Sequence, residues 1–188
     1  MSMKDLKVII NQIVSLSEQD ADIVISHFYE RRLSRGQLLL KKGQVASHYY
    51  FLKSGGLRFS YRDEVELTAW IVQPGEFFTE ISSLSPEIPT RFDIEAIENS
   101  EIYYISKLHM EALYKEIPAW QEFGRKTWER MAIRMINEII RFQTMTVEER
   151  YLEFLKIPGF MQLVSVKQLA SYLGITPNAL SRIRKNLR

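Results

Sequence analysis

The feature that most constrains the fold is Gly174, which separates two short amphipathic stretches in "SVKQLASYLGITPNALSRIRK". Ser165 is a good helix N-cap, and Gln168 three residues later completes a capping-box pattern. Gly174 stands where a helix needs a left-handed residue after its last turn. Thr176 then caps a second helix, with Pro177 at its first position. Two capped helices joined by a glycine predict a helix-turn-helix.

The second of these helices, expected over residues 176–188, has two chemically different faces. At about 100° per residue, its apolar face is formed by Leu180, Ile183 and Leu187. The opposite face is polar and cationic and carries Asn178, Ser181, Arg182 and Lys185. An ordinary surface helix usually mixes both charge signs, and this one contains no acid. Arginine pairs with guanine and asparagine with adenine in the major groove. We therefore predict DNA binding, with Thr176 and Lys167 completing the set.

The charge of the chain is unevenly distributed. Residues 165–188 carry five cations and no acid, a net charge of +5. The whole chain has a net charge of +2, so the remaining residues carry 2 − 5 = −3. A basic end on a mildly acidic body suggests a polyanionic partner. The alternative is a solvated cationic tail.

Several classes of protein are excluded by composition. The chain has no cysteine, which removes disulfides, thiolate nucleophiles and iron–sulfur clusters and suits a reducing cytoplasm. No stretch approaches the roughly 18–20 apolar residues of a membrane span, and the N-terminus lacks a secretory signal. We expect a cytoplasmic protein that does not enter a membrane.

The segment from about residue 31 to residue 105 reads as strands. Short apolar runs are separated by glycines in "RRLSRGQLLLKKGQ", "HYYFLKSGGLRFSYR", "VELTAWIVQPGEFF" and "FDIEAIENSEIYYI". This pattern predicts an antiparallel barrel or sandwich. A short amphipathic helix is expected before it, and another after Ser106, a reasonable N-cap. The fold class is therefore α+β.

A long helix is expected over residues 118–145, with two apolar stripes. The first has a coiled-coil spacing and consists of Trp128, Ala132, Met135, Ile139 and Phe142. The second is rotated by roughly 115° and consists of Ile133, Ile136 and Ile140. Two stripes call for two partners, and we expect the chain's own β domain to cover one stripe and a two-fold mate to cover the other. The alternative is that both are buried within one monomer.

The quoted C-terminal segment closely resembles the helix-turn-helix of the Crp/Fnr family of transcription regulators. The resemblance extends over nearly the whole chain, since Gly36, Gly43, Gly55 and Gly75 stand where that family has turn glycines. It implies an N-terminal antiparallel β-roll of the cyclic-nucleotide-binding type with flanking helices over 1–117, a dimerisation helix over 118–145 and a DNA-binding domain over 146–188. It also places Arg182 at the principal base-reading position, with Asn178 where the family often has Glu.

The same resemblance points to a ligand segment in the roll, "FFTEISSLSPEIPTRFDIEAI". Cyclic-nucleotide members hold the phosphate with a Gly-Glu pair and an arginine. Here Glu80 is kept, but Thr90 stands at the arginine position and Arg91 one place beyond, on the opposite face of a strand. Phe92 fills space that the phosphate needs. We therefore expect weak or absent cyclic-AMP binding, unless a bulge at Pro89 restores the register. If cyclic AMP does not bind, the roll senses another small molecule or has no effector.

Other chemistry finds little support in the sequence. The three histidines lie apart without metal-ligand spacing, and no phosphate-cradling or nucleophile-elbow motif occurs. We expect no enzyme activity, no metal and no certain cofactor. The function expected is a homodimeric regulator that binds a palindromic operator in double-stranded DNA, with RNA polymerase as a further candidate partner. The alternative is a ligand-sensing module whose tail contacts a protein.

Overall fold

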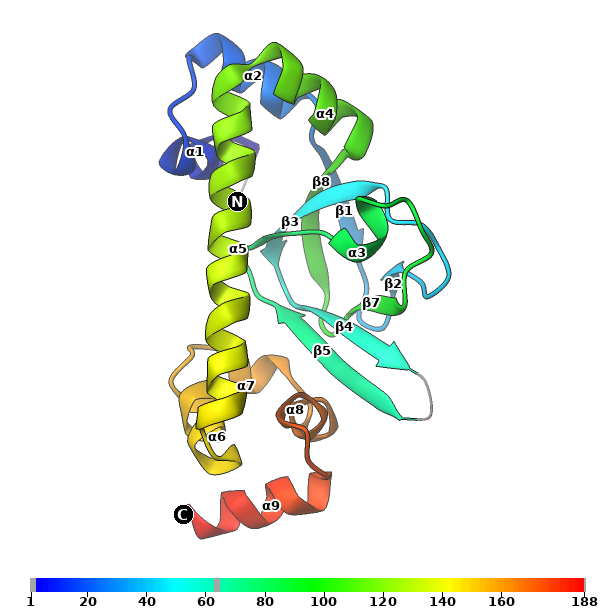
Figure 1. Cartoon of the computed structure of the whole chain (residues 1–188), viewed down its shortest axis with the longest axis vertical. Coiled ribbons are helices and arrows are strands. Elements are labelled where there is room, and N and C mark those ends of the chain that lie inside the picture. The colour runs from blue at the N-terminus through cyan, green and yellow to red at the C-terminus, as the bar shows by residue number, and fades with distance from the viewer. Residues whose placement is uncertain (1–2, 63–64, 188) are drawn as a thin grey trace.

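The computed structural model describes residues 3–62 and 65–187. Its central part is a roll of two antiparallel sheets (Figure 1). One sheet has the order β1–β8–β3–β6, with the bounds Tyr29–Leu33, Ser100–Ser106, His48–Ser54 and Phe77–Phe78. The other has the order β2–β7–β4–β5, with the bounds Leu38–Leu40, Phe92–Ala96, Leu57–Arg62 and Glu66–Val72. Apolar side chains of both sheets form one core.

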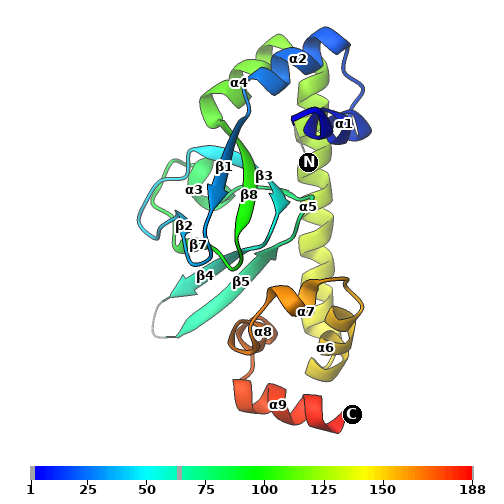
Figure 2. The ribbon, with the colours of Figure 1, turned by 180° about the vertical axis from the view of Figure 1, so that it is seen from behind.

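Helices precede the roll, follow it and run alongside it (Figures 1 and 2). Those near or within the roll are α1 (Met3–Ile13), α2 (Glu18–Ser26), α3 (Ile81–Leu84) and α4 (Lys107–Glu116). The long helix α5 (Pro118–Thr144) extends past the roll to the C-terminal helices. These are α6 (Val147–Leu155), α7 (Phe160–Leu163), α8 (Val166–Leu173) and α9 (Pro177–Asn186).

The α+β architecture expected from the sequence is confirmed: an antiparallel roll, a long helix and C-terminal helices follow in that order. The local signals for helix ends also hold. The Ser106 hydroxyl accepts a hydrogen bond from the backbone N–H of His109 at 3.1 Å and caps α4. Pro118 starts α5 at its first turn, where a missing N–H costs nothing.

A second apolar cluster fastens α5 to the N-terminal part of the chain. It joins α1, α2 and α4 to the first turns of α5. Trp120 and Phe123 of α5 are both fully buried there, with ring centroids 4.1 Å apart. The start of α5 is thus rigidly held, whereas its later turns emerge from the core.

The C-terminal helices share a third apolar cluster with the outer face of the roll. Ile71 and Ile97 of the roll are buried among the side chains of α6, α7 and α8. Gly56 of the roll leaves room for Leu163 of α7, because a Cβ at this glycine would lie 2.2 Å from the Leu163 Cδ1 atom. The C-terminal part is therefore packed against the roll and is not connected to it through α5 alone.

Candidate nucleic-acid interface and sensor site

The helix-turn-helix forms through the local contacts that the sequence predicts. Ser165 and Gln168 exchange hydrogen bonds at both ends of a capping box, at 3.2 and 2.9 Å. Gly174 closes α8 in the left-handed conformation, with φ 76° and ψ 28°. The Thr176 hydroxyl accepts from the backbone N–H of Ala179 at 3.2 Å and caps α9. Each contact that sets the turn thus joins residues no more than four positions apart.

The α9 helix buries one face and exposes the other. Leu180 and Ile183 pack into the third apolar cluster. Leu187 does not: it is 45% exposed at the helix end, so its assignment to the buried face is wrong. The exposed face carries the predicted polar set of Asn178, Ser181, Arg182 and Lys185. Arg188, the last residue of the expected helix, lies outside the described residues.

The side chains of this polar face have few partners within the protein. Within the described ranges, Asn178, Arg182 and Lys185 make no side-chain hydrogen bond or ion pair, and Ser181 only donates to the carbonyl of Pro177 in its own helix. Arg184 is different, because its Nε donates to the Tyr151 hydroxyl at 3.1 Å and ties α9 to α6. The exposed cations therefore keep their donors available for an external acceptor.

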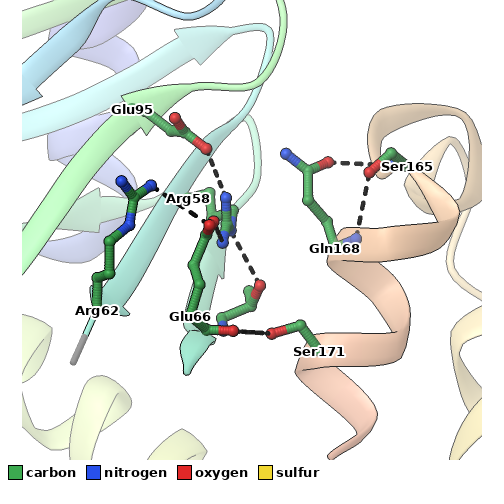
Figure 3. Close-up of polar contacts among 8 residues, drawn as sticks. Arg58, Arg62, Glu66, Glu95, Ser165, Gln168 and Ser171 are labelled. Atoms are coloured by element: carbon green, nitrogen blue, oxygen red, sulfur yellow. Dashed lines mark hydrogen bonds and ion pairs between the residues drawn. The ribbon is translucent and has the colours of Figure 1, made fainter. Parts of the chain in front are cut away.

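The other helix of the motif, α8, docks on the roll. The Ser171 hydroxyl accepts from the backbone N–H of Thr68 at 2.8 Å and donates to the carbonyl of Glu66 at 3.2 Å (Figure 3). Both backbone groups belong to β5, the edge strand of its sheet. An edge strand presents unpaired backbone groups that need partners, and Ser171 supplies them. Lys167, predicted to contact DNA, is exposed on this helix. The pKa of Glu66 is lowered chiefly by its hydrogen bond to Arg58, and the charge of Lys167 adds a small part.

Behind this contact lies a buried cationic side chain. The guanidinium of Arg58 bonds Thr68 at 2.9 Å and Glu95 at 2.6 Å, and it also pairs with Glu66 (Figure 3). Hydrogen bonding to Arg58 holds the pKa of Glu66 below its ordinary value, with Arg62 adding a smaller effect. A buried charge is tolerated when its hydrogen bonds are satisfied, so this cluster stiffens the β4–β5 hairpin on which α8 rests.

The Arg58 cluster and the Ser171 contact were missed by the sequence reasoning. Ser171 and Thr68 are 103 residues apart, and a serine in a short helix carries no signal for such pairing. The alternation of "LRFSYR", which puts Arg58 between apolar neighbours, is the weak signal that could have indicated a buried arginine.

The predicted ligand segment in the roll is closed by its own contacts. Glu80 is buried at the N-terminus of α3, where one carboxylate oxygen accepts from the Ser82 backbone at 3.1 Å and from its hydroxyl at 2.6 Å. The other oxygen is buried without a hydrogen-bond partner in the described part of the chain. Thr79, the residue before Glu80, donates its hydroxyl hydrogen to the carbonyl of His48.

Thr90 and Arg91 point in opposite directions. The pairing of β7 with β4 is regular from Phe92 to Ala96, and Pro89 forms an isolated bridge with Val45. Thr90 is buried and accepts from the Phe92 backbone, whereas Arg91 is exposed. The Phe92 ring packs edge-on against those of Phe59 and Tyr61. Among the described residues no hydrogen bond or ion pair joins Glu80 to Thr90 or Arg91, and a shared ligand site remains a prediction.

Both apolar stripes of α5 are exposed in the single chain. Their large aliphatic and aromatic side chains are between 46% and 59% exposed: Met135, Ile139, Phe142, Ile133, Ile136 and Ile140. Ala132 is also exposed, and Trp128 is half-buried near the roll. The expectation that the β domain covers one stripe is therefore wrong, as is the alternative that the monomer buries both. The roll instead contacts the far side of α5, where Arg134 pairs with Glu76 at 2.5 Å.

The histidines do not form a metal site in the part of the chain that the structure describes. His27 and His109 come together edge-to-face, with ring centroids 4.9 Å apart. No group of three potential ligands is found among these residues.

Comparison with known proteins identifies the class to which this fold belongs. Residues 30–116 match the family model of the cyclic nucleotide-binding domain. Three solved structures are similar over most of the chain. CLP of Xanthomonas campestris, described as a c-di-GMP responsive global regulator, has a TM-score of 0.71 at 18% identity and 91% coverage of both chains. FixK2 from Bradyrhizobium japonicum has a TM-score of 0.69 at 19% identity, and the match covers 85% of this chain and 84% of that chain. The catabolite activator protein of Thermus thermophilus has a TM-score of 0.57 at 20% identity, and the match covers 95% of this chain and 86% of that chain.

The roll thus has the fold of a cyclic nucleotide-binding domain. The chain as a whole has the fold of the Crp/Fnr regulators, as the sequence resemblance implied. No curated protein sequence matches this chain. Among the described residues, no helix combines the length and apolar character needed to cross a membrane.

Proposed function

We propose that the protein is a homodimeric, sequence-specific DNA-binding transcription regulator of the Crp/Fnr type that acts in the cytoplasm. In this proposal α9 enters the major groove and Arg182 reads a base. Lys185 and Lys167 contact phosphates, and the N-terminal end of α9 at Thr176 lies against the backbone.

One observation carries this proposal: α9 exposes an acid-free face whose cations have no partner among the described residues. Arg184, by contrast, is used within the fold, where it donates to the Tyr151 hydroxyl. Arginine and asparagine side chains in such an arrangement match the donor and acceptor pattern of the major groove.

The broad apolar surface of α5 supports the homodimer. Six large apolar side chains on one helix, each about half exposed, exceed what a soluble monomer usually leaves in contact with water. A two-fold mate would pair α5 with α5 and relate two α9 helices by symmetry. Such a dimer reads a palindrome with half-sites about one helical turn apart.

The test is selection of random duplexes by the purified protein, followed by affinity measurements on the selected site. Arg182→Ala should cost about 1–3 kcal/mol and relax the preference at one base pair, and Arg182→Lys should not restore it, because lysine lacks the bidentate geometry. Lys185→Ala should weaken all sequences evenly and flatten the salt dependence. Arg35→Ala, an exposed arginine on the roll, is the control. If Arg182→Ala prefers the selected site over other sequences as strongly as the unmodified chain does, the proposed placement of α9 in the major groove is overturned.

The effector of the roll is proposed not to be cyclic AMP. Glu80 is satisfied in part by Ser82. The Phe92 ring packs against Phe59, and in this proposal it takes space that a phosphate would need. An anion site without its arginine lacks its strongest charge-assisted contact. Addition of cyclic AMP should therefore leave the melting temperature unchanged.

A further inference from the structure

A cleft lies outside the predicted ligand segment, between α1, the turn before β6 and α5. It encloses about 430 Å³, within the range of small-molecule sites. Its apolar wall comes from Ile9 and Ile13 of α1, Phe77 of β6 and Met131 of α5. Glu80, Thr90 and Arg91 do not line it.

The charged groups of the cleft are unequally satisfied. Arg134 is fully engaged: it pairs with Glu76 at 2.5 Å, and its guanidinium lies over the Trp70 ring, 4.3 Å from the centroid. Arg130, one turn earlier on α5, is exposed and has no hydrogen bond or ion pair to any residue that the structure describes. Two arginines and one glutamate leave the cleft with a single surplus positive charge, which suits a monoanion.

A polar side chain of the wall also lacks a partner. Thr127 is among the residues that line the cleft, and its hydroxyl oxygen is buried and makes no hydrogen bond within the described residues. Buried polar groups are nearly always paired, so a lone hydroxyl beside apolar side chains suggests a bound molecule that contributes a hydrogen-bonding atom.

The cleft stays open in the proposed dimer. The angles around the axis of α5 can be counted from Trp128 at about 100° per residue. The two apolar stripes are then centred at about 0° and about 115°. On the same reckoning Thr127, Arg130, Met131 and Arg134 lie between about −60° and −160°. A mate that covers the stripes therefore leaves the cleft side of α5 free.

We propose that this cleft binds a small organic carboxylate with an apolar body, whose carboxylate pairs with Arg130 while the body lies against Phe77, Ile13 and Met131. The walls come from α1, the roll and α5, so a bound molecule fastens the roll to α5 and stabilises that arrangement. The inference concerns ligand binding and does not require that α9 binds DNA.

The experiment titrates the full chain with octanoate and with 2-naphthoate, and with the neutral analogues 1-octanol and 2-naphthalenemethanol. Binding is followed by the melting temperature and by tryptophan fluorescence, since Trp70 borders the cleft. The carboxylates should bind saturably and about tenfold more tightly than the alcohols, the ratio expected for one charge-assisted contact.

Variants locate the site. Arg130→Gln should weaken the carboxylates about tenfold and leave the alcohols unchanged, and Thr127→Val should weaken both classes. Arg125→Gln, on the same helix but outside the cleft and paired with Glu129, should have no effect. The proposal is overturned if neither carboxylate binds saturably, or if Arg130→Gln binds them as well as the unmodified chain. DNA affinity is measured separately, so either proposal can fail without the other.

Discussion

The Gly174→Ala substitution isolates the contribution of the helix-turn-helix turn to stability. Gly174 has a φ of +76°, and a Cβ built on it meets no atom within 4 Å. A methyl group would therefore cause no clash, and the cost comes only from the left-handed backbone. That conformation costs a residue with a Cβ about 1–2 kcal/mol. For a chain of this size each kcal/mol lowers the melting temperature by about 2–4 °C, so we expect a decrease of about 2–8 °C.

The assay is differential scanning calorimetry of the unmodified chain, Gly174→Ala and Gly174→Asn. Asparagine tolerates the left-handed region better than alanine does, so its melting temperature should lie between the other two. DNA affinity of the alanine variant should fall as well, because α8 and α9 lose their fixed angle. The reasoning is refuted if alanine leaves the melting temperature unchanged, or if asparagine costs as much as alanine.

Three further predictions concern the contacts of the motif and of α5. Ser171→Ala should lower the stability by about 1–2 kcal/mol, because the Thr68 N–H loses its acceptor; thermal melting beside Ser181→Ala, an exposed control on α9, checks this. Ile139→Glu should convert the dimer into a monomer in sedimentation experiments, since it puts a charge on the apolar surface of α5; a dimer of unchanged affinity would contradict the proposed interface. The pKa of Glu66 is lowered chiefly by Arg58, so its contribution to stability is present at neutral pH and is lost as the pH falls below about 4. In Glu66→Gln the free energy of unfolding should therefore fall less steeply as the pH is lowered below about 4. If the variant loses stability with falling pH as steeply as the unmodified chain does, this role of Glu66 is contradicted.

The local parts of the fold could be predicted because their causes lie close together in the chain. The capping box, the left-handed Gly174 and the Ser106 cap each depend on residues within a few positions, and the structure has all of them. The opposed faces of α9 follow from helical periodicity in the same way, although Leu187 lies one residue past the end of the helix and is exposed.

The sequence alone also determined the alternation in "FDIEA", where Ile94 and Ala96 are buried, because a strand has a strict period of two. It did not determine where this strand begins. The structure starts β7 at Phe92, so Thr90 and Arg91 precede the strand, and its start depends on pairing with β4, about thirty residues away in the chain.

The placement of whole elements was decided only by the tertiary structure. Periodicity showed that α5 has two apolar stripes, but it could not show which side of the helix meets the roll; the Arg134–Glu76 pair and the Trp70 ring select the polar side. The docking of α8 on β5 and the cleft beside Arg130 likewise join segments far apart in sequence. Short-range patterns specify each helix and turn because the chain itself brings their residues together. Contacts between distant segments depend on how all the elements pack at once, and no window of sequence contains that information.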